Sequence, residues 1–403
     1  HTVDPSVAAA MLPSLAAAML PWLAAAAPNF ALPFSWDTLP VYFHSQNKTG
    51  LWNDEALKQI SRFPLATVEK SHAGDKEDDY LNIATEECRR IAGLGTNTRN
   101  VYYTNSLIDW KPNPLHELMV LHPEWRIKDK LGEDLEIFPG VWGFNFSVPE
   151  MREEWIFNCL QAIDLGCDAC FVDRSNNFTQ VSTKQSMSKE DSVRFEEAHM
   201  TTLKELNERL AARESFAISN NQGLIPEDTT VMMIEDFAAS DRCVKVLRLA
   251  VERGLAVQVH AGDIVDDGSN ETKDQCVNGD INAMAAFLIG AGKFSYYRCA
   301  AHWVSDSRWP DVPDAWLDWL PEYDKPLGEP LGPGKKNLDG VWHRNFSKGT
   351  RVLFDAVLGN GTIIWGDGAE QRGNCSHLKP ADYGCYWQSM SLQLQEVDLS
   401  ATI

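Results

Sequence analysis

Residues 150–173 read EMREEWIFNCLQAIDLGCDACFVD, and this stretch contains one complete helix-and-strand unit. In its first part, 150–164, apolar residues recur at three- and four-residue steps, which predicts an amphipathic helix packed on a core. Its last part, 169–173, is a short apolar run that ends on a carboxylate, which predicts a buried strand. The stretch is therefore typical of a parallel α/β fold.

The same unit recurs along the chain from Trp36 onward. The expected strands are 40–45, 65–70, 101–106, 169–173, 216–220, 231–235, 256–260 and 294–298. The expected helices, each with a polar face opposite its apolar face, are 53–62, 77–91, 150–164, 190–213, 241–253 and 280–291. Because eight parallel strands close a barrel, we expect an α/β fold of the (β/α)8 TIM-barrel type over residues 34–339.

Two units are irregular, and the C-terminal region has a different pattern. Between the fifth and sixth strands only 224–228 is available for a helix, and 312–320 is expected to form the last helix of the barrel. Residues 340–403 then shift to β-like runs, with 350–355 and 362–365 on either side of Gly359-Asn-Gly, a hairpin-turn sequence. We expect a small β-rich appendage there.

Residues 1–33 form an apolar tail. Residues 6–28 read SVAAAMLP, SLAAAMLP and WLAAAAP, and no charge lies between Asp4 and Asp37. The start at His1 without a basic segment disfavours a signal peptide, and a proline in each repeat would interrupt a membrane-spanning helix. An exposed apolar segment needs a surface that covers it, so we expect the tail to dock on its own barrel or on a neighbouring copy.

The overall charge excludes one class of partner. The formal net charge of the 403 residues is −21, and no Lys/Arg-rich stripe is present. Such a chain cannot neutralise a phosphate backbone, so nucleic acid is not an expected partner. The same acidity disfavours binding to anionic membranes.

Sequons and cysteines indicate a secretory route. Seven Asn-x-Ser/Thr sequons lack proline, which predicts a secreted glycoprotein with N-linked glycans at Asn47, Asn145, Asn177, Asn270, Asn345, Asn360 and Asn374. The nine cysteines predict disulfides, with one cysteine left over. Cys375 and Cys385, in a polar stretch rich in turn residues, are the pair most expected to be bonded. Cys167 and Cys170 form a CxxC, but no second ligand pair follows at zinc spacing, and no metal site or cofactor is expected.

Polar residues at strand ends are the candidate functional residues, because TIM-barrel active sites lie at the C-terminal ends of the strands. Asp173 and Glu235 each end a strongly apolar strand, where a charge is costly unless it is paired or functional. Strands four and six are two apart, so their ends can face each other. Glycoside hydrolysis needs such a pair, and we assign Asp173 as nucleophile or base and Glu235 as general acid. In the alternative interpretation, Asp173 pairs with Arg174 and Glu235 caps the loop into the next helix.

Further candidates for substrate contact follow other strands. They are Glu69, Tyr103, Asp109, Trp110, Asn220, His260 and Trp303, with the aromatic residues as stacking platforms for sugars. Each has a structural alternative: Glu69 in an internal salt bridge, with Lys70 on the opposite face if the strand persists, His260 hydrogen-bonded within the barrel, and the aromatic rings in the core. No GxSxG, GxxxxGK[ST], HExxH or GxGxxG motif supports another chemistry.

Several short motifs, taken in order, resemble glycoside-hydrolase-like TIM-barrel proteins. They are Phe144-Asn-Phe-Ser-Val-Pro-Glu-Met-Arg152, Phe171-Val-Asp-Arg-Ser175, Glu322-Tyr-Asp-Lys-Pro-Leu-Gly-Glu-Pro330 and Arg344-Asn-Phe-Ser-Lys-Gly349. The resemblance covers about residues 36–366 and not the tail. It implies the barrel and a sugar-related site, with Asp173 as the strand-four acid and Glu235 as the strand-six acid, as in alpha-galactosidase-like barrels.

Two functions are therefore compatible with the sequence. The first is a secreted glycoside hydrolase that acts on a carbohydrate without a metal. The second is a structural glycoprotein subunit of an extracellular filament or assembly, in which residues 6–28 dock on a neighbouring subunit and the barrel serves as a scaffold.

Overall fold

Eight parallel strands form the centre of the computed structural model. The model describes residues 31–48, 50–70, 72–73, 79–175, 187–220, 228–262, 276, 280–300, 318–373 and 385. The strands are β1 (Phe43–Ser45), β2 (Leu65–Val68), β3 (Arg99–Asn105), β6 (Ala169–Asp173), β7 (Phe216–Asn220), β8 (Val231–Ile234), β9 (Ala256–Ala261) and β10 (Ser295–Cys299), and they pair in this order. A parallel bridge between Val41 and Tyr297 joins the two edges, so the sheet is a nearly closed (β/α)8 barrel. The predicted fold class is confirmed.

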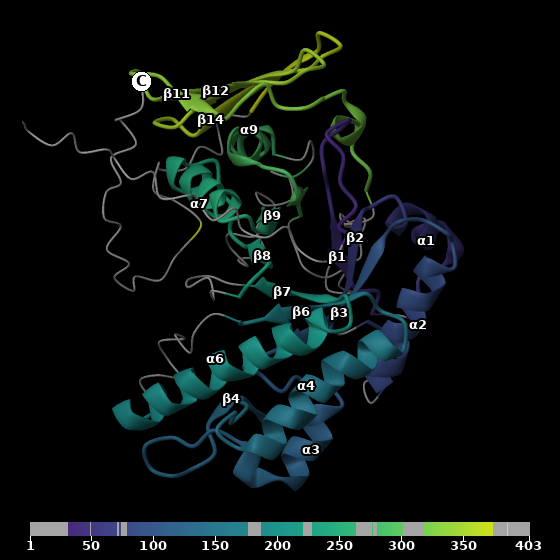
Figure 1. Cartoon of the computed structure of the whole chain (residues 1–403), viewed down its shortest axis with the longest axis vertical. Coiled ribbons are helices and arrows are strands. Elements are labelled where there is room, and N and C mark those ends of the chain that lie inside the picture. Colours follow the sequence, from purple (N-terminus) through teal and green to yellow (C-terminus); the bar gives the residue numbers. More distant parts are fainter. Residues whose placement is uncertain are drawn as a thin grey trace, which may run out of the picture.

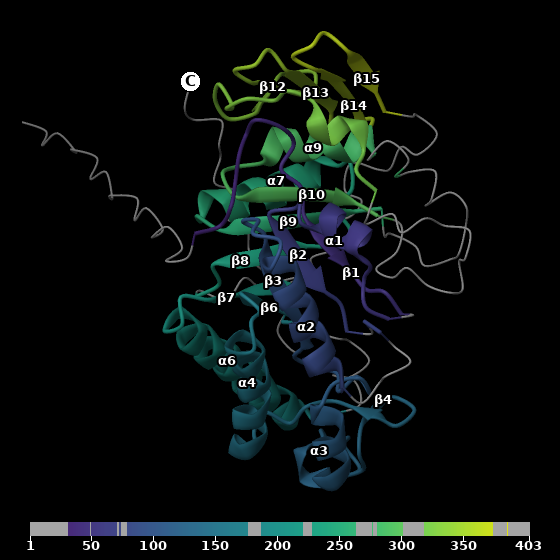
Figure 2. The same ribbon diagram turned by 90° about the vertical axis from the view of Figure 1, so that its right-hand side faces the viewer.

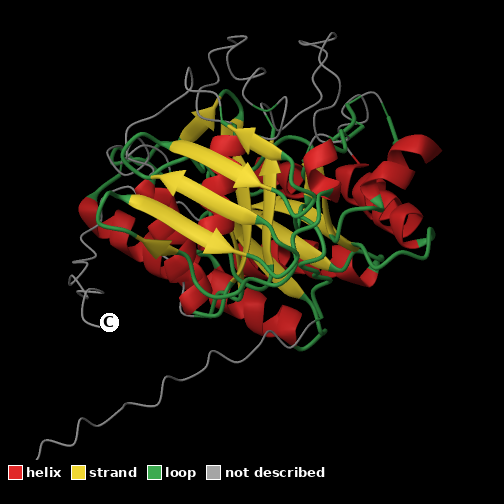
Figure 3. Cartoon of the chain, turned by 90° about the horizontal axis from the view of Figure 1, so that it is seen from above, coloured by secondary structure: helices red, strands yellow, loops and turns green. Residues whose placement is uncertain are grey.

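The helices lie around the outside of the strands (Figures 1 and 3). They are α1 (Asp54–Ile60), α2 (Tyr80–Ala92), α4 (Pro149–Asp164), α6 (Lys189–Ala211), α7 (Asp241–Glu252) and α9 (Ile281–Gly290), at the six predicted places. Side chains cap several of them: Ser188 Oγ accepts from the N–H of Asp191, and Ser240 Oγ accepts from the N–H of Cys243. Two further helices were expected, at 224–228 and 312–320. Residues 224–227 and 312–317 lie outside the described residues, and residues 318–320 are not helical.

An insertion between β3 and α4 is an element that the sequence analysis did not predict. Residues 106–148 contain α3 (Leu115–Leu121), a 3-10 turn (η2, Pro123–Trp125) and a hairpin of β4 (Glu136–Phe138) and β5 (Val141–Trp142). The insertion has a small core of its own, in which Leu107, Ile127 and Val141 pack with Phe195 of α6. In Figures 1 and 2 it lies at the opposite end of the molecule from the C-terminal sheet.

The C-terminal region forms a five-stranded antiparallel sheet. Its strands are β11 (Lys335–Lys336), β12 (Val341–Asn345), β13 (Arg351–Asp355), β14 (Asn360–Ile364) and β15 (Glu370–Arg372), in that order. The predicted hairpin is the β13–β14 pair, but the sheet begins at Lys335, before the expected boundary at 340. Residues 386–403 lie outside the described part of the chain.

The sheet covers helix α9, and this contact corrects one expectation. All ten residues of α9 are buried, so the helix has no polar face toward solvent. Gly361 of β14 allows the close approach, because a Cβ there would lie 2.6 Å from the Cβ of Ala285. The buried Arg344 donates from Nη1 to the carbonyls of Leu288 and Ala291 and so caps the C-terminal end of α9.

Four disulfides are present, and one of them contradicts a prediction. They join Cys88 to Cys167, Cys159 to Cys170, Cys243 to Cys385 and Cys276 to Cys299. Cys385 is therefore bonded to Cys243, with 5.5 Å between their Cα atoms, and not to Cys375, which lies outside the described residues. Nearness along the chain does not decide this pairing, because the fold brings Cys385 to the start of α7.

Residues 1–30, which contain the octad repeats of 6–28, lie outside the described part of the chain. Among the residues that are described, no helix has both the length and the apolar composition needed to cross a membrane.

Candidate functional site

Asp173, the last residue of β6, accepts four hydrogen bonds through its carboxylate. Oδ1 accepts from Nδ2 of Asn220 at 2.9 Å and from the backbone N–H of Arg174 at 2.9 Å. Oδ2 accepts from the Tyr103 hydroxyl at 2.6 Å and from Nδ2 of Asn105 at 2.9 Å. The three side-chain donors come from β3 and β7, the two strands that pair with β6. They hold the half-buried carboxylate in one orientation and stabilise its negative charge.

None of these four donors carries a formal charge on the donating group. Among the described residues, Asp173 makes no ion pair, and Arg174 contacts it through the backbone N–H alone. Burial and the nearby Asp173 charge raise the pKa of Tyr103 well above its ordinary value, so its hydroxyl keeps the proton that it donates. The predicted alternative, an Asp173–Arg174 salt bridge, is not found.

Lys70 lies close to this carboxylate, and here the structure differs from the expectation. Strand β2 ends at Val68, so the alternation of faces stops, and Lys70 turns back to pair with Glu69. Its Nζ lies 4.8 Å from the ring centroid of Tyr103 and 5.6 Å from that of Trp110. The internal salt bridge considered for Glu69 is therefore present, but it stands beside Asp173.

The charge of Glu235 also acts on the Lys70 ammonium. Burial lowers the pKa of Lys70, but the charges of Glu69, Asp173 and Glu235 outweigh burial and raise it above the ordinary value. Glu235 also acts on the buried Tyr42, where it adds to the effect of burial in raising the pKa of the hydroxyl. Glu235 and Asp173 thus act on the same ammonium from two strand ends. The N-cap of α7 is Ser240, so Glu235 does not cap that helix.

The residues that directly follow both acids have an unusual backbone conformation. Arg174 has a φ of 57° and Asp236 a φ of 52°, both in the left-handed region that is unfavourable for non-glycine residues. Strained backbone of this kind is concentrated at functional sites. Burial also raises the pKa of Asp236, the residue after Glu235, to about 6.

His260 lies inside the barrel and is fully buried. Its Nε2 is 3.1 Å from the carbonyl oxygen of Ala300. Burial lowers the pKa of His260 to about 3, so the ring is neutral at physiological pH. This arrangement agrees with the interpretation of His260 as a hydrogen-bonded residue of the barrel interior.

Asp109 has a structural role at the base of the insertion. Its buried carboxylate accepts the backbone N–H of Trp142 and lies 2.9 Å from Nδ1 of His116. Both contacts join the first residues of the insertion to its later parts, and the Asp109 side chain is fully buried. Trp303, another predicted contact, lies outside the described residues.

Two residues of the site were missed in the sequence analysis. Asn105 lies two positions after Tyr103 on the same strand, and this spacing places both side chains on one face. This spacing predicts Asn105 as a site residue if Tyr103 is one. Lys70 had no such signal, because its position depends on the turn that follows Val68.

Four of the seven sequons lie in the described part of the chain. Asn345 on β12 is exposed, and Asn47, Asn145 and Asn360 are half-buried. Asn177, Asn270 and Asn374 lie outside the described residues.

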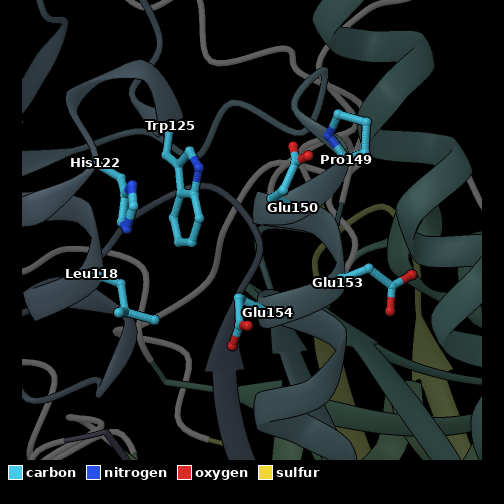
Figure 4. A pocket seen from close by; sticks show the side chains of 7 residues that line it. All are labelled: Leu118, His122, Trp125, Pro149, Glu150, Glu153 and Glu154. Carbon is cyan, nitrogen blue, oxygen red and sulfur yellow. The ribbon is translucent and has the colours of Figure 1, made fainter.

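Two hollows on the surface are separate from these strand ends. One, of about 580 Å³, lies between α3 and the start of α4, where the stacked rings of His122 and Trp125 face Glu150 and Glu154 (Figure 4). The other, of about 330 Å³, is lined mainly by apolar residues that precede β1, β2 and β3, such as Phe34, Phe63 and Pro64. The loops that follow β6, β7, β9 and β10 fall largely outside the described residues. No group of three or more His, Cys, Asp or Glu within the described residues is arranged to hold a metal ion.

Similar solved structures include several carbohydrate-active enzymes. The glycoside hydrolase domain of PelA from Pseudomonas aeruginosa is 11% identical, with a TM-score of 0.42 over 65% of this chain and 94% of that one. The maltogenic alpha-amylase AmyB from Thermotoga neapolitana is 12% identical, with a TM-score of 0.48 over 83% and 93%. Ega3 from Aspergillus fumigatus, solved in complex with galactosamine, is 15% identical, with a TM-score of 0.40 over 67% and 96%. No curated protein sequence matches this chain.

A family model matches most of the barrel. The match covers residues 102–350, which run from β3 to the turn before β13 and include both Asp173 and Glu235, but not Glu69 or Lys70. The matched part is well over half of the chain, and its fold is the one described above. The chain belongs to hypothetical glycosyl hydrolase family 15.

Proposed function

We propose that this protein hydrolyses glycosidic bonds, with Asp173 as nucleophile or base and Glu235 as general acid. The observation that carries the proposal is the set of uncharged donors around Asp173. A carboxylate must be ionised and correctly oriented to attack an anomeric carbon or to activate water. Four hydrogen bonds supply that orientation, and no described residue forms a direct ion pair that would neutralise the charge.

Glu235 supports the proposal through its place at the end of the second strand after β6. The reaction needs one carboxyl that is kept protonated until it assists the leaving oxygen. Glu235 shares the electrostatic environment of Lys70 with Asp173. Burial raises the pKa of the next residue, Asp236, to about 6. The test below therefore compares the loss of the Asp236 carboxyl with the loss of the Glu235 carboxyl.

Extracellular action is part of the same proposal. Four disulfides are typical of proteins that fold in an oxidising compartment. The exposed sequon at Asn345 is available for a glycan. Digestion of the secreted protein with an N-glycosidase, followed by mass spectrometry, would detect occupied sequons.

The test compares activity on a panel of glycans for wild type, Asp173→Asn, Glu235→Gln and Asp236→Asn. We expect kcat to fall about 10²- to 10⁴-fold in the first two variants, as is usual when a general acid or base is removed. Asp168→Asn is the matched control, because Asp168 directly precedes β6 at the opposite end of the barrel and bonds Arg99 and the N–H of Asn100. The control should retain wild-type kcat. Equal losses in Asp168→Asn and Asp173→Asn would show that the effect comes from the fold.

A second function, as a subunit of an extracellular assembly, is favoured by the apolar hollow of about 330 Å³ beside the residues that precede β1, β2 and β3. Pro33, Phe34 and Leu39 line this hollow together with Trp319, and the uncharged segment 6–28 joins the barrel immediately before them. We propose that residues 6–28 of a neighbouring copy would occupy it. Sedimentation of the full chain and of a variant lacking residues 1–30 tests this idea, and a monomer in both cases would remove it.

A further inference from the structure

The insertion between β3 and α4 carries a pair of stacked aromatic rings near the candidate acids. Connections from strand to helix in α/β units usually have about 2–6 residues, whereas residues 106–148 contain α3, η2 and the β4–β5 hairpin. Trp110 lies at its start, and Phe138 is the last residue of β4. Their ring centroids are 5.3 Å apart and their planes differ by 23°.

These rings continue a series of contacts that begins at Asp173. The Tyr103 hydroxyl bonds the Asp173 carboxylate, and Nζ of Lys70 lies over the rings of both Tyr103 and Trp110. Trp110 in turn stacks on Phe138. The series Asp173–Tyr103–Lys70–Trp110–Phe138 therefore leads from the candidate catalytic carboxylate to the hairpin of the insertion.

Exposure increases along the three aromatic rings of the series. Tyr103 is 3% exposed, Trp110 is partly buried, and Phe138 is 47% exposed. Trp110 packs on the core of the insertion, and Phe138 stacks on Trp110 while about half of its own surface stays exposed. Exposed aromatic rings beside a site are a common feature of ligand-binding surfaces, and their flat apolar faces suit the flat apolar faces of sugar rings.

Lys70 adds a polar contact at the inner end. Its ammonium has three N–H donors, and Glu69 is the only acceptor that the described residues provide for them. The side chain is 26% exposed. The remaining donors can bind sugar hydroxyls beside Asp173.

We propose that Trp110 and Phe138 form a subsite for a sugar unit beyond the one that reacts at Asp173, so that the substrate is a polysaccharide or a long oligosaccharide. This inference rests on the proposed hydrolase function. A short glycoside would fill the position at Asp173 and Lys70 without reaching the two rings. A longer chain would gain their stacking energy in addition.

The experiment measures kcat/KM for Phe138→Ala and Trp110→Phe on soluble starch, galactomannan, xylan and chitosan, and on size-fractionated oligosaccharides of whichever polymer is cleaved. We expect Phe138→Ala to lower kcat/KM about 2- to 10-fold for the polymer and long oligosaccharides, which is the usual worth of an aromatic stacking contact. The shortest cleaved oligosaccharide should be unaffected. Leu131→Ala is the matched control, because Leu131 is an exposed apolar residue of the same insertion at 77% exposure.

Binding provides a readout that does not depend on catalysis. In affinity electrophoresis through gels containing each polymer, the wild type and Asp173→Asn should be retarded and Phe138→Ala should be retarded less. Retardation without any hydrolysis would refute the proposed catalytic function and leave the subsite supported. Loss of activity in Phe138→Ala that is equal for all chain lengths, or no effect at any length, would overturn the subsite.

Discussion

Replacing Asp173 with asparagine tests the hydrogen-bond network around the candidate nucleophile. The wild-type carboxylate offers acceptors on both oxygens, two donors to each: Asn220 and the N–H of Arg174 on Oδ1, Tyr103 and Asn105 on Oδ2. An asparagine has one oxygen and one NH₂ group. The two donors that pointed at the lost oxygen then face the new NH₂ group, which is itself a donor.

The neighbours can relieve only part of this conflict. If the new NH₂ replaces Oδ2, the Tyr103 hydroxyl can rotate to accept, but Asn105 cannot reverse its amide because its Oδ1 already accepts two backbone N–H groups. If the NH₂ replaces Oδ1, Asn220 can reverse its amide, but the backbone N–H of Arg174 cannot become an acceptor. One N–H is left without an acceptor in either case, which costs about 1–3 kcal/mol; Nδ2 of Asn105 keeps only its second bond, to the Tyr103 hydroxyl at 3.2 Å. The half-buried position of Asp173 favours the lower part of that range.

The assay is urea unfolding at pH 7, followed by tryptophan fluorescence, for wild type and Asp173→Asn. The control is Asp54→Asn, because the Asp54 side chain is fully exposed and such substitutions change stability by less than about 0.5 kcal/mol. A free energy of unfolding for Asp173→Asn equal to that of the control would refute the network argument. The result also matters for activity measurements, which should be made well below the unfolding transition of the variant.

Three further predictions concern stability. Burial raises the pKa of Asp109 to about 6 in the folded protein, above its unfolded value. Its contribution to stability is therefore present at low pH and is lost as pH rises from about 4 to 6. Asp109→Asn should remove up to roughly 3 kcal/mol of that loss, and a variant with the wild-type difference in unfolding free energy between pH 4 and pH 7 would contradict the prediction. Gly361→Ala should destabilise the protein by about 1–3 kcal/mol, because the new Cβ would approach Ala285 and the carbonyl of Ile281; calorimetry measures the change, and wild-type stability would mean that the sheet moves away from α9 at no cost. The double variant Cys243→Ser, Cys385→Ser opens a loop with a sequence separation of 142, so it should lose roughly 5 kcal/mol; urea unfolding tests this, and a loss below about 1 kcal/mol, far from the loop-closure value, would show that other contacts already hold residue 385.

The barrel strands could be predicted because each is a short apolar run bounded by turn residues. Strands β6 and β7 have the predicted bounds at both ends. The insertion has the opposite property: β4 and β5 are only two or three residues long, and Asp109, which follows β3 within the insertion, holds their hairpin by accepting from the N–H of Trp142. Helix α9 was recognised as a helix, but its burial on all sides depends on the sheet that follows it in sequence.

The site could be predicted only where chemistry and strand position coincide. Asp173 was found because a carboxylate ends an apolar run, and Asn220 because an amide ends the next strand. The role of Tyr103 differs from the predicted one: it was chosen as a stacking platform, and the structure has its hydroxyl on Asp173. Register between neighbouring strands decides such a contact, and the sequence of a single strand does not contain it.

The two ends of strand β6 show what distinguishes a structural carboxylate from a candidate catalytic one in this protein. At the N-terminal end, Asp168 pairs with the guanidinium of Arg99 and with the N–H of Asn100, so its charge is neutralised by a direct partner. At the C-terminal end, Asp173 is held as firmly, yet by a hydroxyl and amide groups alone. A barrel that served only as a scaffold would gain more from the first arrangement, or from an apolar residue with apolar neighbours, than from three side chains around a carboxylate that has no direct ion pair among the described residues. An oriented, negatively charged oxygen is also what the proposed role of Asp173 as nucleophile or base requires.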